Sequence, residues 1–447
     1  MDPSPPRAAA LVHLAVVGLA LLGASCAAPT PFPPRSPLAI ANSPAPPAAD
    51  GTAADPDLVA TATPAADATA VPTAVVAPPE PLELPPGFAI GVFAQLGLPV
   101  AMMAVAPNGD VFATVPAEDR VIVLPDRDQN GLADALPTGQ EGPALVFAAG
   151  RELNRPWGLA FGPDALYVAC TDAVWAFDYQ PGQLLAVDPP RRLVDLPGGG
   201  SNWERGLVLG PDGRLYVSVG APCASCRPED VRTAAVLSLD VAGGQNTLFA
   251  AGLRRSLDLA FHPRSGELFV GDQGRDGLGD DLPPDELNRL SAGAHYGWPG
   301  CYGAAVPDRT AEAPGDAGFC DATTAPLLAL QAHGAVSGLL FYSGKQFPAD
   351  YRGDLYVAVH GSDARRELPV GYNVLRIPMQ GDLPRGEVFD FVSGWLRPDT
   401  RRWGGPVDLA QARDGSLLIS DDRGGMVYRV FSTLPTPTAL PEATAQP

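Results

Sequence analysis

Positive charge is scarce in this sequence of 447 residues. Lysine and arginine together number 30 against 50 aspartates and glutamates, so the formal net charge is −20 at pH 7. Lys345 is the only lysine, and almost every positive charge is therefore an arginine. An acidic surface repels phosphate backbones, and we expect no nucleic-acid partner.

Charged residues of both signs are few, at 18%, which argues against a coiled coil or a charge-rich disordered chain. Glycine and proline are abundant instead, with 49 and 51 residues, and they favour many turns over long helices. Hydrophobic residues make up 46% of the chain, which is enough for a substantial core. The composition suits a large all-β domain.

A short apolar run near the N-terminus, residues 8–22, follows Arg7. It is shorter than the roughly 20 residues of a membrane span and predicts a signal peptide. The run ends in Leu22-Gly23-Ala24-Ser25-Cys26, which resembles a bacterial lipobox with Leu22 one position too far from Cys26. We expect residues 1–26 to direct export and Cys26 to carry a lipid anchor. Such a lipoprotein would lie at the outer face of the cell membrane or in the periplasm, and cleavage to a soluble secreted protein is the alternative.

Residues 27–81 are dominated by Ala, Pro, Thr and Val, and Phe32 is their only aromatic residue. A stretch of this kind cannot bury a core, so we expect an extended tether. Residues 432–447 have the same character and are predicted to be a disordered tail. The predicted folded unit is therefore 82–431.

A short pattern recurs six times in this unit. Each copy is a turn containing Pro, Asn, Asp or Gly, followed by a small apolar strand, and a second apolar run precedes it. The strands begin at Val111, Leu166, Leu215, Leu268, Leu355 and Leu417. Repeats roughly 50 residues long with several short strands are typical of a β-propeller. We predict an all-β fold, a six-bladed β-propeller, with a long inserted loop region after the fourth repeat, where the interval is longest.

Arginines precede the first apolar run in four of the six repeats, where a propeller would place them around its central channel. They are Arg155, Arg205, Arg254, Arg255, Arg401 and Arg402. A ring of guanidinium groups suggests an anionic ligand such as a polycarboxylate. Pairing of these arginines with acidic neighbours at blade junctions is the alternative.

A candidate calcium loop lies at residues 126–134. Asp126, Asp128, Asn130 and Asp134 occupy positions 1, 3, 5 and 9 of an EF-hand-type loop with glycine at position 6, and Leu132 stands at position 7. Position 12 is Pro137 rather than glutamate. We expect Ca²⁺ here, with a solvated acidic turn as the alternative. Residues 272–288 hold five more aspartates and Glu286, and suggest a second cation or a hydrogen-bonded scaffold.

Four of the remaining cysteines are predicted to form disulfides because the chain carries an export signal. Cys301 and Cys320 flank a loop, and Cys223 and Cys226 form a CxxC pair without a second pair of zinc ligands. Cys170 lies in a predicted strand, and we expect it to be buried and inert.

Several motifs together resemble the soluble PQQ-dependent sugar dehydrogenases, and most closely their glucose/sorbosone dehydrogenase-like branch. The motifs are Gly252–Arg255, Leu259–Pro263, Gly266–Leu268, Asp272–Asp276, Asp285–Asn288 and His295–Pro299. The resemblance covers most of 82–431 and is specific over 252–303. It implies a six-bladed propeller that holds pyrroloquinoline quinone (PQQ) and Ca²⁺ in its central pocket and oxidises aldoses at C1.

The resemblance also implies roles for individual residues. Arg254 would pair with a PQQ carboxylate, Gln273 would line the cofactor, and Arg365 matches a basic position on the fifth blade. The backbone carbonyls of Gly274 and Arg275 would bind the calcium ion. Arg255 stands where the family has an asparagine that contacts the cofactor.

One departure concerns catalysis directly. The family's general base is a histidine before the third inner strand, and Asn202 aligns with that position. Asparagine cannot act as a base near neutral pH, and Ala221 replaces the acid that would support the histidine. Glu204 is a candidate substitute base.

These observations predict an exported quinoprotein-type dehydrogenase that uses PQQ and calcium to oxidise a small-molecule sugar or related alcohol. The electron acceptor is unknown. A surface propeller that binds a ligand without catalysis is the first alternative. A calcium-dependent lactonase is the second, and it is less favoured because it needs several pocket carboxylates on one metal.

Overall fold

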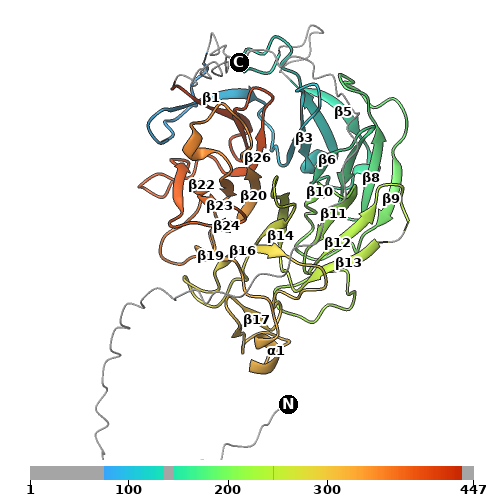
Figure 1. Cartoon of the computed structure of the whole chain (residues 1–447), viewed down its shortest axis with the longest axis vertical. Coiled ribbons are helices and arrows are strands. Elements are labelled where there is room, and N and C mark those ends of the chain that lie inside the picture. Colours follow the sequence, from blue (N-terminus) through green and yellow to red (C-terminus); the bar gives the residue numbers. More distant parts are fainter. Residues whose placement is uncertain (1–74, 135–143, 245, 435–447) are drawn as a thin grey trace, which may run out of the picture. The chain divides into compact units, whose positions relative to one another are not determined.

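The computed structural model describes residues 75–134, 144–244 and 246–434. Six four-stranded antiparallel sheets are arranged around one central axis (Figure 1). The prediction of a six-bladed β-propeller is confirmed. No helix in these residues is long and apolar enough to cross a membrane.

The first three blades follow one another along the chain, each from its inner to its outer strand. Blade 1 comprises β2 (Met103–Val105), β3 (Val111–Val115), β4 (Arg120–Leu124) and β5 (Leu145–Ala149). Blade 2 comprises β6 (Leu159–Phe161), β7 (Ala165–Ala169), β8 (Ala173–Asp178) and β9 (Arg191–Asp195). Blade 3 comprises β10 (Leu207–Leu209), β11 (Arg214–Val219), β12 (Ala235–Asp240) and β13 (Asn246–Ala251).

The next two blades have additional segments between their strands. Blade 4 comprises β14 (Ser256–Phe261), β15 (Leu268–Asp272), β16 (Asp285–Leu290) and β19 (Leu328–Leu330). Blade 5 comprises β20 (Val336–Phe341), β21 (Leu355–Val359), β22 (Asn373–Ile377) and β25 (Phe389–Val392). Two small hairpins are β17 (Cys301–Tyr302) with β18 (Val306–Pro307), and β23 (Met379–Gln380) with β24 (Leu383–Pro384). The helical elements are α1 (Ala317–Asp321) and the 3₁₀ turns Pro116–Glu118, Arg151–Leu153 and Ala349–Tyr351.

The sixth blade joins segments from the two ends of the described chain. Its strands are β26 (Pro406–Gln411), β27 (Leu417–Asp421), β28 (Met426–Ser432) and β1 (Phe88–Gln95). β1 pairs with β28 from Phe88 opposite Ser432 to Gln95 opposite Met426. This pairing closes the ring of blades.

The recurring pattern of the sequence corresponds to the two inner strands of each blade. In blade 3 the predicted apolar run and strand are β10 and β11, and Leu209 pairs with Leu215 across their turn. Gly213 in this turn has φ of +78°, and Gly415 in the matching turn of blade 6 has φ of +86°. Residues with side chains rarely adopt this left-handed conformation, which explains the glycines.

The core consists of apolar layers between adjacent blades rather than one central cluster. Between blades 2 and 3, for example, Ala169 and Val174 pack in one cluster with Leu215 and Val217. Hydroxyl groups add links near the axis: the Ser218 Oγ accepts from the Gly206 N–H at 2.8 Å and donates to the Ser256 carbonyl at 2.6 Å. Each blade thus covers the apolar face of its neighbour.

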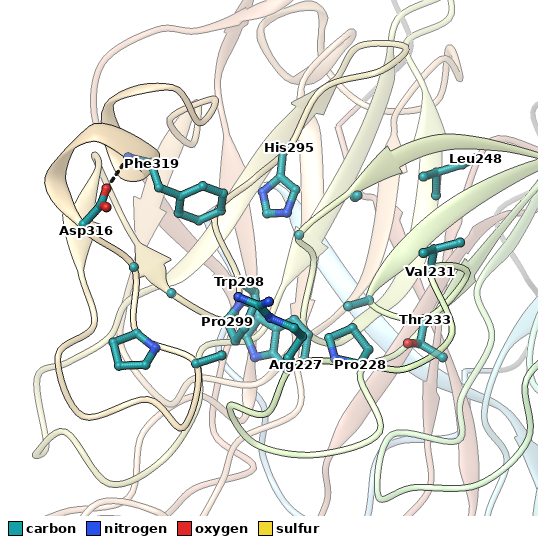
Figure 2. A pocket seen from close by; sticks show the side chains of 17 residues that line it. Arg227, Pro228, Val231, Thr233, Leu248, His295, Trp298, Pro299, Asp316 and Phe319 are labelled. Carbon is teal, nitrogen blue, oxygen red and sulfur yellow. Dashed lines mark hydrogen bonds between the residues drawn. The ribbon is translucent and has the colours of Figure 1, made fainter.

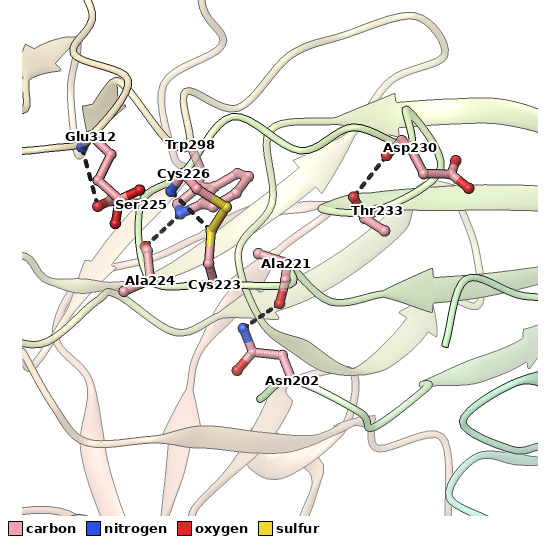
Figure 3. Close-up of a disulfide and its surroundings, with 10 residues drawn as sticks. All are labelled: Asn202, Ala221, Cys223, Ala224, Ser225, Cys226, Asp230, Thr233, Trp298 and Glu312. Carbon is pink, nitrogen blue, oxygen red and sulfur yellow. Dashed lines mark hydrogen bonds between the residues drawn. A yellow bond between two sulfur atoms is a disulfide. The ribbon is translucent and has the colours of Figure 1, made fainter. Parts of the chain in front are cut away.

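The long insertion lies within blade 4, between β16 and β19. A disulfide between Cys301 and Cys320 closes it, and a second disulfide joins Cys223 to Cys226. Both predicted pairs are confirmed, and Cys170 is a free buried cysteine whose thiol pKa burial raises. The indole N–H of Trp298 in the insertion donates to the Ala224 carbonyl at 2.9 Å, so the insertion is attached to the CxxC loop of blade 3 (Figure 3).

Candidate functional site

A cavity of about 480 Å³ opens where the inner strands begin, at one end of the central channel. Residues before the inner strands and after the second strands of blades 2 to 6 line it. Trp157, Leu257 and Val407 belong to an apolar cluster at the axis and form its apolar wall. The remaining lining is mostly polar, so the cavity suits a polar small molecule in contact with an apolar surface.

One network of side chains crosses three blades in this pocket. The Arg255 Nη2 lies 2.5 Å from Oε1 of Glu204, and its Nε lies 3.4 Å from Oε2. The Arg255 Nη1 donates to Oε1 of Gln273 at 2.9 Å, and the Gln273 Nε2 donates to the Val336 carbonyl at 2.7 Å. Glu204 lines the pocket and is 5% exposed, but both of its oxygens face a guanidinium group.

Arg254 contributes the second guanidinium group of the pocket. Backbone N–H groups of Arg254 and Arg255 each donate to Asp272 at 2.8 Å, which fixes this turn of the chain. Burial raises the pKa of Asp272 and lowers the pKa of Arg254. The Nε of Arg254 is buried without a hydrogen-bond partner. A buried donor of this kind is costly unless an acceptor meets it, and a ligand carboxylate would fit.

The carbonyls predicted to bind calcium have a different partner. The Arg254 Nη1 donates to the Gly274 carbonyl at 2.9 Å and to the Gln273 carbonyl at 3.3 Å. The Arg275 side chain turns to Asp308, with Nε 2.6 Å from Oδ2. A calcium ion at the Gly274 carbonyl would meet a guanidinium group, so this arrangement does not fit the ion.

The predicted ring of arginines is not formed, because only Arg254 and Arg255 line the pocket. Arg205 donates to the carbonyls of Asn202, Glu204 and Pro197. Arg401 pairs with Glu80 at 2.6 Å, and Arg402 pairs with Asp363 at 2.6 Å.

Arg155 of the predicted ring, and Arg365, which was predicted separately, also have partners of their own. Arg155 stacks on Trp203, with its guanidinium carbon 3.5 Å from the ring centroid. Arg365, predicted to bind the cofactor, donates to the Asp280 carbonyl at 2.8 Å and lies 3.2 Å from Asp281, outside the residues that line the pocket. Most of these arginines therefore contact acids, carbonyls or aromatic rings, although the Nε atoms of Arg205, Arg365 and Arg402, like that of Arg254, are buried without a hydrogen-bond partner.

Asn202, at the family's base position, is 4% exposed and lies outside the pocket lining. Its Nδ2 donates to the Ala221 carbonyl at 2.9 Å, beside the Cys223–Cys226 disulfide (Figure 3). The side chain therefore stabilises the loop after β11.

Two histidines that the sequence reasoning missed line the pocket. The Nε2 of His360 lies 2.9 Å from Oδ1 of Asp422, which also lines the pocket. The Nε2 of His333 lies 2.8 Å from the Gly279 carbonyl, and its Nδ1 lies 3.3 Å from Asp276. His360 and Asp422 come from blades 5 and 6 and are far apart in sequence, so no local motif connects them.

The acids of the pocket are individually satisfied. Asp285 is buried and accepts N–H groups from Gly274 at 3.0 Å and Ala335 at 2.7 Å, and burial raises its pKa to about 6. Within the described ranges, the one group of three or more potential metal ligands is Asp126, Asp128 and Asp134, outside this pocket. The pocket therefore offers no cluster of carboxylates for the metal that a lactonase needs.

The predicted calcium loop does bring its acids together. Carboxylate oxygens of Asp126, Asp128 and Asp134 lie within 4.8 Å of one another. The Gly131 N–H donates to one oxygen of Asp126 at 3.1 Å, while the other oxygen is buried without a partner. Burial, together with the neighbouring Asp128 charge, raises the pKa of Asp126 to about 6. Pro137 lies outside the described residues.

A second cavity, of about 560 Å³, lies between blade 3 and the insertion. Figure 2 shows Trp298 and Phe319 of the insertion facing Val231 and Leu248, with His295 between them. The His295 and Phe319 ring centroids are 5.3 Å apart. This cleft lies away from the predicted site residues.

Comparison with known proteins supports the resemblance found in the sequence. Residues 197–366 match the glucose/sorbosone dehydrogenase family, and this segment contains Glu204, Arg254, Arg255, Gln273 and His360. This match agrees with the resemblance carried by the motifs in 252–303. An uncharacterized protein of Borreliella burgdorferi is 28% identical over 301 residues, which cover 64% of this chain and 78% of that protein.

Solved structures share the fold at low identity. The holo form of the pyranose dehydrogenase PQQ domain from Coprinopsis cinerea has a TM-score of 0.66 and 19% identity, covering 81% of this chain and 99% of that chain. A calcium structure of the carbohydrate-active enzyme family AA12 from Trichoderma reesei has a TM-score of 0.65 and 20% identity, covering 79% and 97%. A PQQ-bound aldose sugar dehydrogenase from Streptomyces coelicolor has a TM-score of 0.52 and 17% identity, covering 78% and 99%.

Proposed function

We propose that this protein is a quinoprotein dehydrogenase that oxidises a hydroxyl group of a sugar or related alcohol, with PQQ in the central pocket. The observation that carries the proposal is Arg254: its side chain lines a cavity built largely by the family-matched segment, and its Nε is buried without a hydrogen-bond partner. PQQ carries carboxylates that could meet this donor, and when bound it supplies the two-electron oxidant.

The residues of the chain would hold and orient the reactants. Arg254 would bind a carboxylate, and the ion pair between Arg255 and Glu204 would keep Gln273 in place beside it. The apolar wall of Trp157, Leu257 and Val407 would exclude water from one side of the pocket. Exclusion of water strengthens the polar contacts formed within the cavity.

Titration of the full-length protein with PQQ tests this function. We expect a saturable change in PQQ absorbance and sugar-dependent reduction of a dye with a panel of aldoses. Arg254→Gln should weaken PQQ binding about tenfold to a hundredfold, because one charge-assisted hydrogen bond to the cofactor is lost. Arg264→Gln, an exposed arginine outside the pocket, is the matched control. Absence of PQQ binding to the folded wild-type protein would overturn the proposal.

A binding propeller without catalysis is the second candidate. It is favoured by Asn202, which is buried in a structural hydrogen bond at the family's base position, and by the engagement of both Glu204 oxygens. Saturable PQQ or sugar binding without any dye reduction would support this candidate instead.

We also propose that the loop of Asp126, Asp128, Asn130, Leu132 and Asp134 binds a calcium ion. The clustered carboxylates and the unpartnered buried oxygen of Asp126 support a hard cation at this place. Such an ion would stabilise the contact of this blade 1 loop with blade 6, because the Ala133 N–H donates to the Phe93 carbonyl of β1 at 2.8 Å.

Export and lipid attachment through Cys26 remain part of the proposal and rest on the N-terminal sequence. Retention of the wild-type protein in the membrane fraction, and its release by Cys26→Ala, would support the anchor. Recovery of both proteins in the soluble fraction would contradict it.

A further inference from the structure

His360 and Asp422 form a pair within the central pocket that no sequence motif had indicated. His360 follows β21 of blade 5, and Asp422 follows β27 of blade 6. Both side chains line the cavity, and their ring Nε2 and carboxylate Oδ1 are 2.9 Å apart. The side chains are 27% and 35% exposed, so both are reachable from the cavity and partly shielded from solvent.

We propose that His360, oriented by Asp422, accepts the proton of the substrate hydroxyl group in this pocket. The inference rests on the proposed dehydrogenase function and supplies the base that the Asn202 position lacks. Asp422 is a positioning residue in this assignment, because it acts through the imidazole ring.

The contacts of the ring indicate which nitrogen accepts the proton. Each nitrogen faces an oxygen acceptor, since Nδ1 lies 3.2 Å from the Gly361 carbonyl and Nε2 lies 2.9 Å from Asp422. A neutral imidazole has one N–H and can satisfy only one of these acceptors. The shorter contact, with a carboxylate, favours a proton on Nε2. Nδ1 is then the nitrogen left to accept a proton, and once protonated it can donate to the Gly361 carbonyl.

Neighbouring charges leave His360 as the best placed of the pocket's candidate bases. Glu204 is held by Arg255, and Asp363 is paired with Arg402 at 2.6 Å. Asp285 is buried on backbone N–H groups. His333 is paired with Asp276, whose side chain is 71% exposed, and its Nε2 is 2.8 Å from a carbonyl, so its orienting carboxylate is largely in solvent.

The local backbone also keeps room for the pair. Gly405 lies against it, and a Cβ there would lie 3.1 Å from the His360 Nε2 and 3.4 Å from the Asp422 Oδ1. The Gly405 N–H donates to Asp421 at 2.8 Å, which fixes this glycine beside the two side chains. A larger residue at position 405 would crowd the histidine.

In the proposed step the O–H bond of the substrate breaks and its proton moves to the Nδ1 of His360. The C–H bond at the same carbon would break as well, and PQQ, when bound, would supply the two-electron oxidant that takes up the hydride. The carbon–oxygen bond becomes a double bond. The histidine, left as an imidazolium ion stabilised by Asp422, returns the proton to solvent or to the reduced oxidant.

The test compares pocket variants of the full-length protein loaded with PQQ. His360→Ala should lower kcat for sugar-dependent dye reduction by about 10² to 10⁴-fold, with little change in the KM for the sugar. Added imidazole should restore part of this activity. Asp422→Asn should cause an intermediate loss of kcat, because a carboxylate no longer orients the imidazole ring. His295→Gln, in the second cavity, is the matched control.

A second measurement needs no cofactor. Proton–nitrogen NMR spectra of the unloaded protein at alkaline pH should show His360 with its proton on Nε2, and Asp422→Asn should abolish this tautomer preference. Full activity of His360→Ala with an unchanged pH profile would overturn the inference while leaving the dehydrogenase function in place. A loss of kcat of about 10²-fold or more in His333→Ala, without such a loss in His360→Ala, would do the same. Absence of wild-type turnover with every substrate would overturn both.

Discussion

At the scale of single residues, this propeller uses buried carboxylates as links between blades. Asp258 of β14 accepts the Leu339 N–H of β20 at 2.8 Å, and Asp408 of β26 accepts the Met103 N–H of β2 at 2.6 Å. Each acid therefore joins the inner strand of its blade to that of the next. Burial raises the pKa of both, and the charge of Asp258 raises that of Asp408 further.

These raised pKa values make stability depend on pH. A buried acid whose folded-state pKa is raised contributes its full stabilisation below the ordinary pKa of about 3.9, and this is lost as the pH rises. The limiting slope is about 1.4 kcal/mol per pH unit for each proton. We expect Asp258→Asn to flatten the decline in unfolding free energy between pH 5 and pH 8, measured by urea denaturation.

Asp188→Asn, an exposed aspartate of blade 2, should reproduce the wild-type slope. The asparagine variant loses one backbone acceptor and should be less stable than the wild type at pH 5. A decline with pH as steep in Asp258→Asn as in the wild type would show that Asp258 is not the group that titrates.

At the scale of elements, the acidic loop after β4 is the clearest candidate for a functional turn. Its three carboxylates repel one another, and a cation would remove this repulsion. Calcium and protons compete for Asp126, whose pKa is raised to about 6. We therefore expect calcium affinity to be highest above pH 7 and to fall about tenfold per pH unit below pH 6, measured by calorimetry.

Asp128→Asn should weaken this binding without changing the strands, because Asp128 accepts only from Asn130 of the same loop. Calcium should also raise the melting temperature of the wild type and have less effect on the variant. Equal calcium binding by wild type and Asp128→Asn would place the ion elsewhere.

The sequence predicted the inner strands well, because turn and alternating strand recur together in every blade. It placed the insertion only coarsely. β16, the third strand of blade 4, reads Asp285-Glu286-Leu287-Asn288-Arg289-Leu290 and lacks an apolar alternation, although its acids are buried. A polar strand of this kind resembles a loop in sequence, so the prediction placed the insertion after the fourth repeat without distinguishing β16, and the structure places it between β16 and β19.

The site was harder to predict, because its contacts join distant segments. Arg254, Arg255 and Gln273 lie within 20 residues of one another on blade 4, and Glu204 lies just before β10 of blade 3. The motifs placed these residues in the pocket. Arg365 turned out to face Asp280 and Asp281, which stand in an acidic loop that sequence spacing could not place. His360 and Asp422 meet only because blades 5 and 6 are neighbours in the closed ring.

At the scale of the whole molecule, closure of the ring depends on one strand from the N-terminal side. β1 buries Val92, Phe93 and Ala94 and pairs along β28, so it supplies the outer strand of blade 6. Residues before it are also attached: the Val92 N–H donates to the Val76 carbonyl at 2.8 Å, and Glu80 pairs with Arg397 and Arg401.

This closure predicts sharply different outcomes for two truncations. A chain that begins at residue 75 keeps β1 and its attached segment, and should melt in a single transition near that of the full-length protein.

A chain that begins at residue 96 lacks β1 and exposes the edge of β28. It also loses the burial of Val92 and Phe93, and burying each of these side chains contributes about 1.5 to 3 kcal/mol to the free energy of unfolding. An open edge also templates pairing with other chains. We expect it to aggregate or to lose the cooperative transition, measured by circular dichroism and size-exclusion chromatography. A soluble monomer with an unchanged melting temperature would show that the other five blades hold the ring closed without β1.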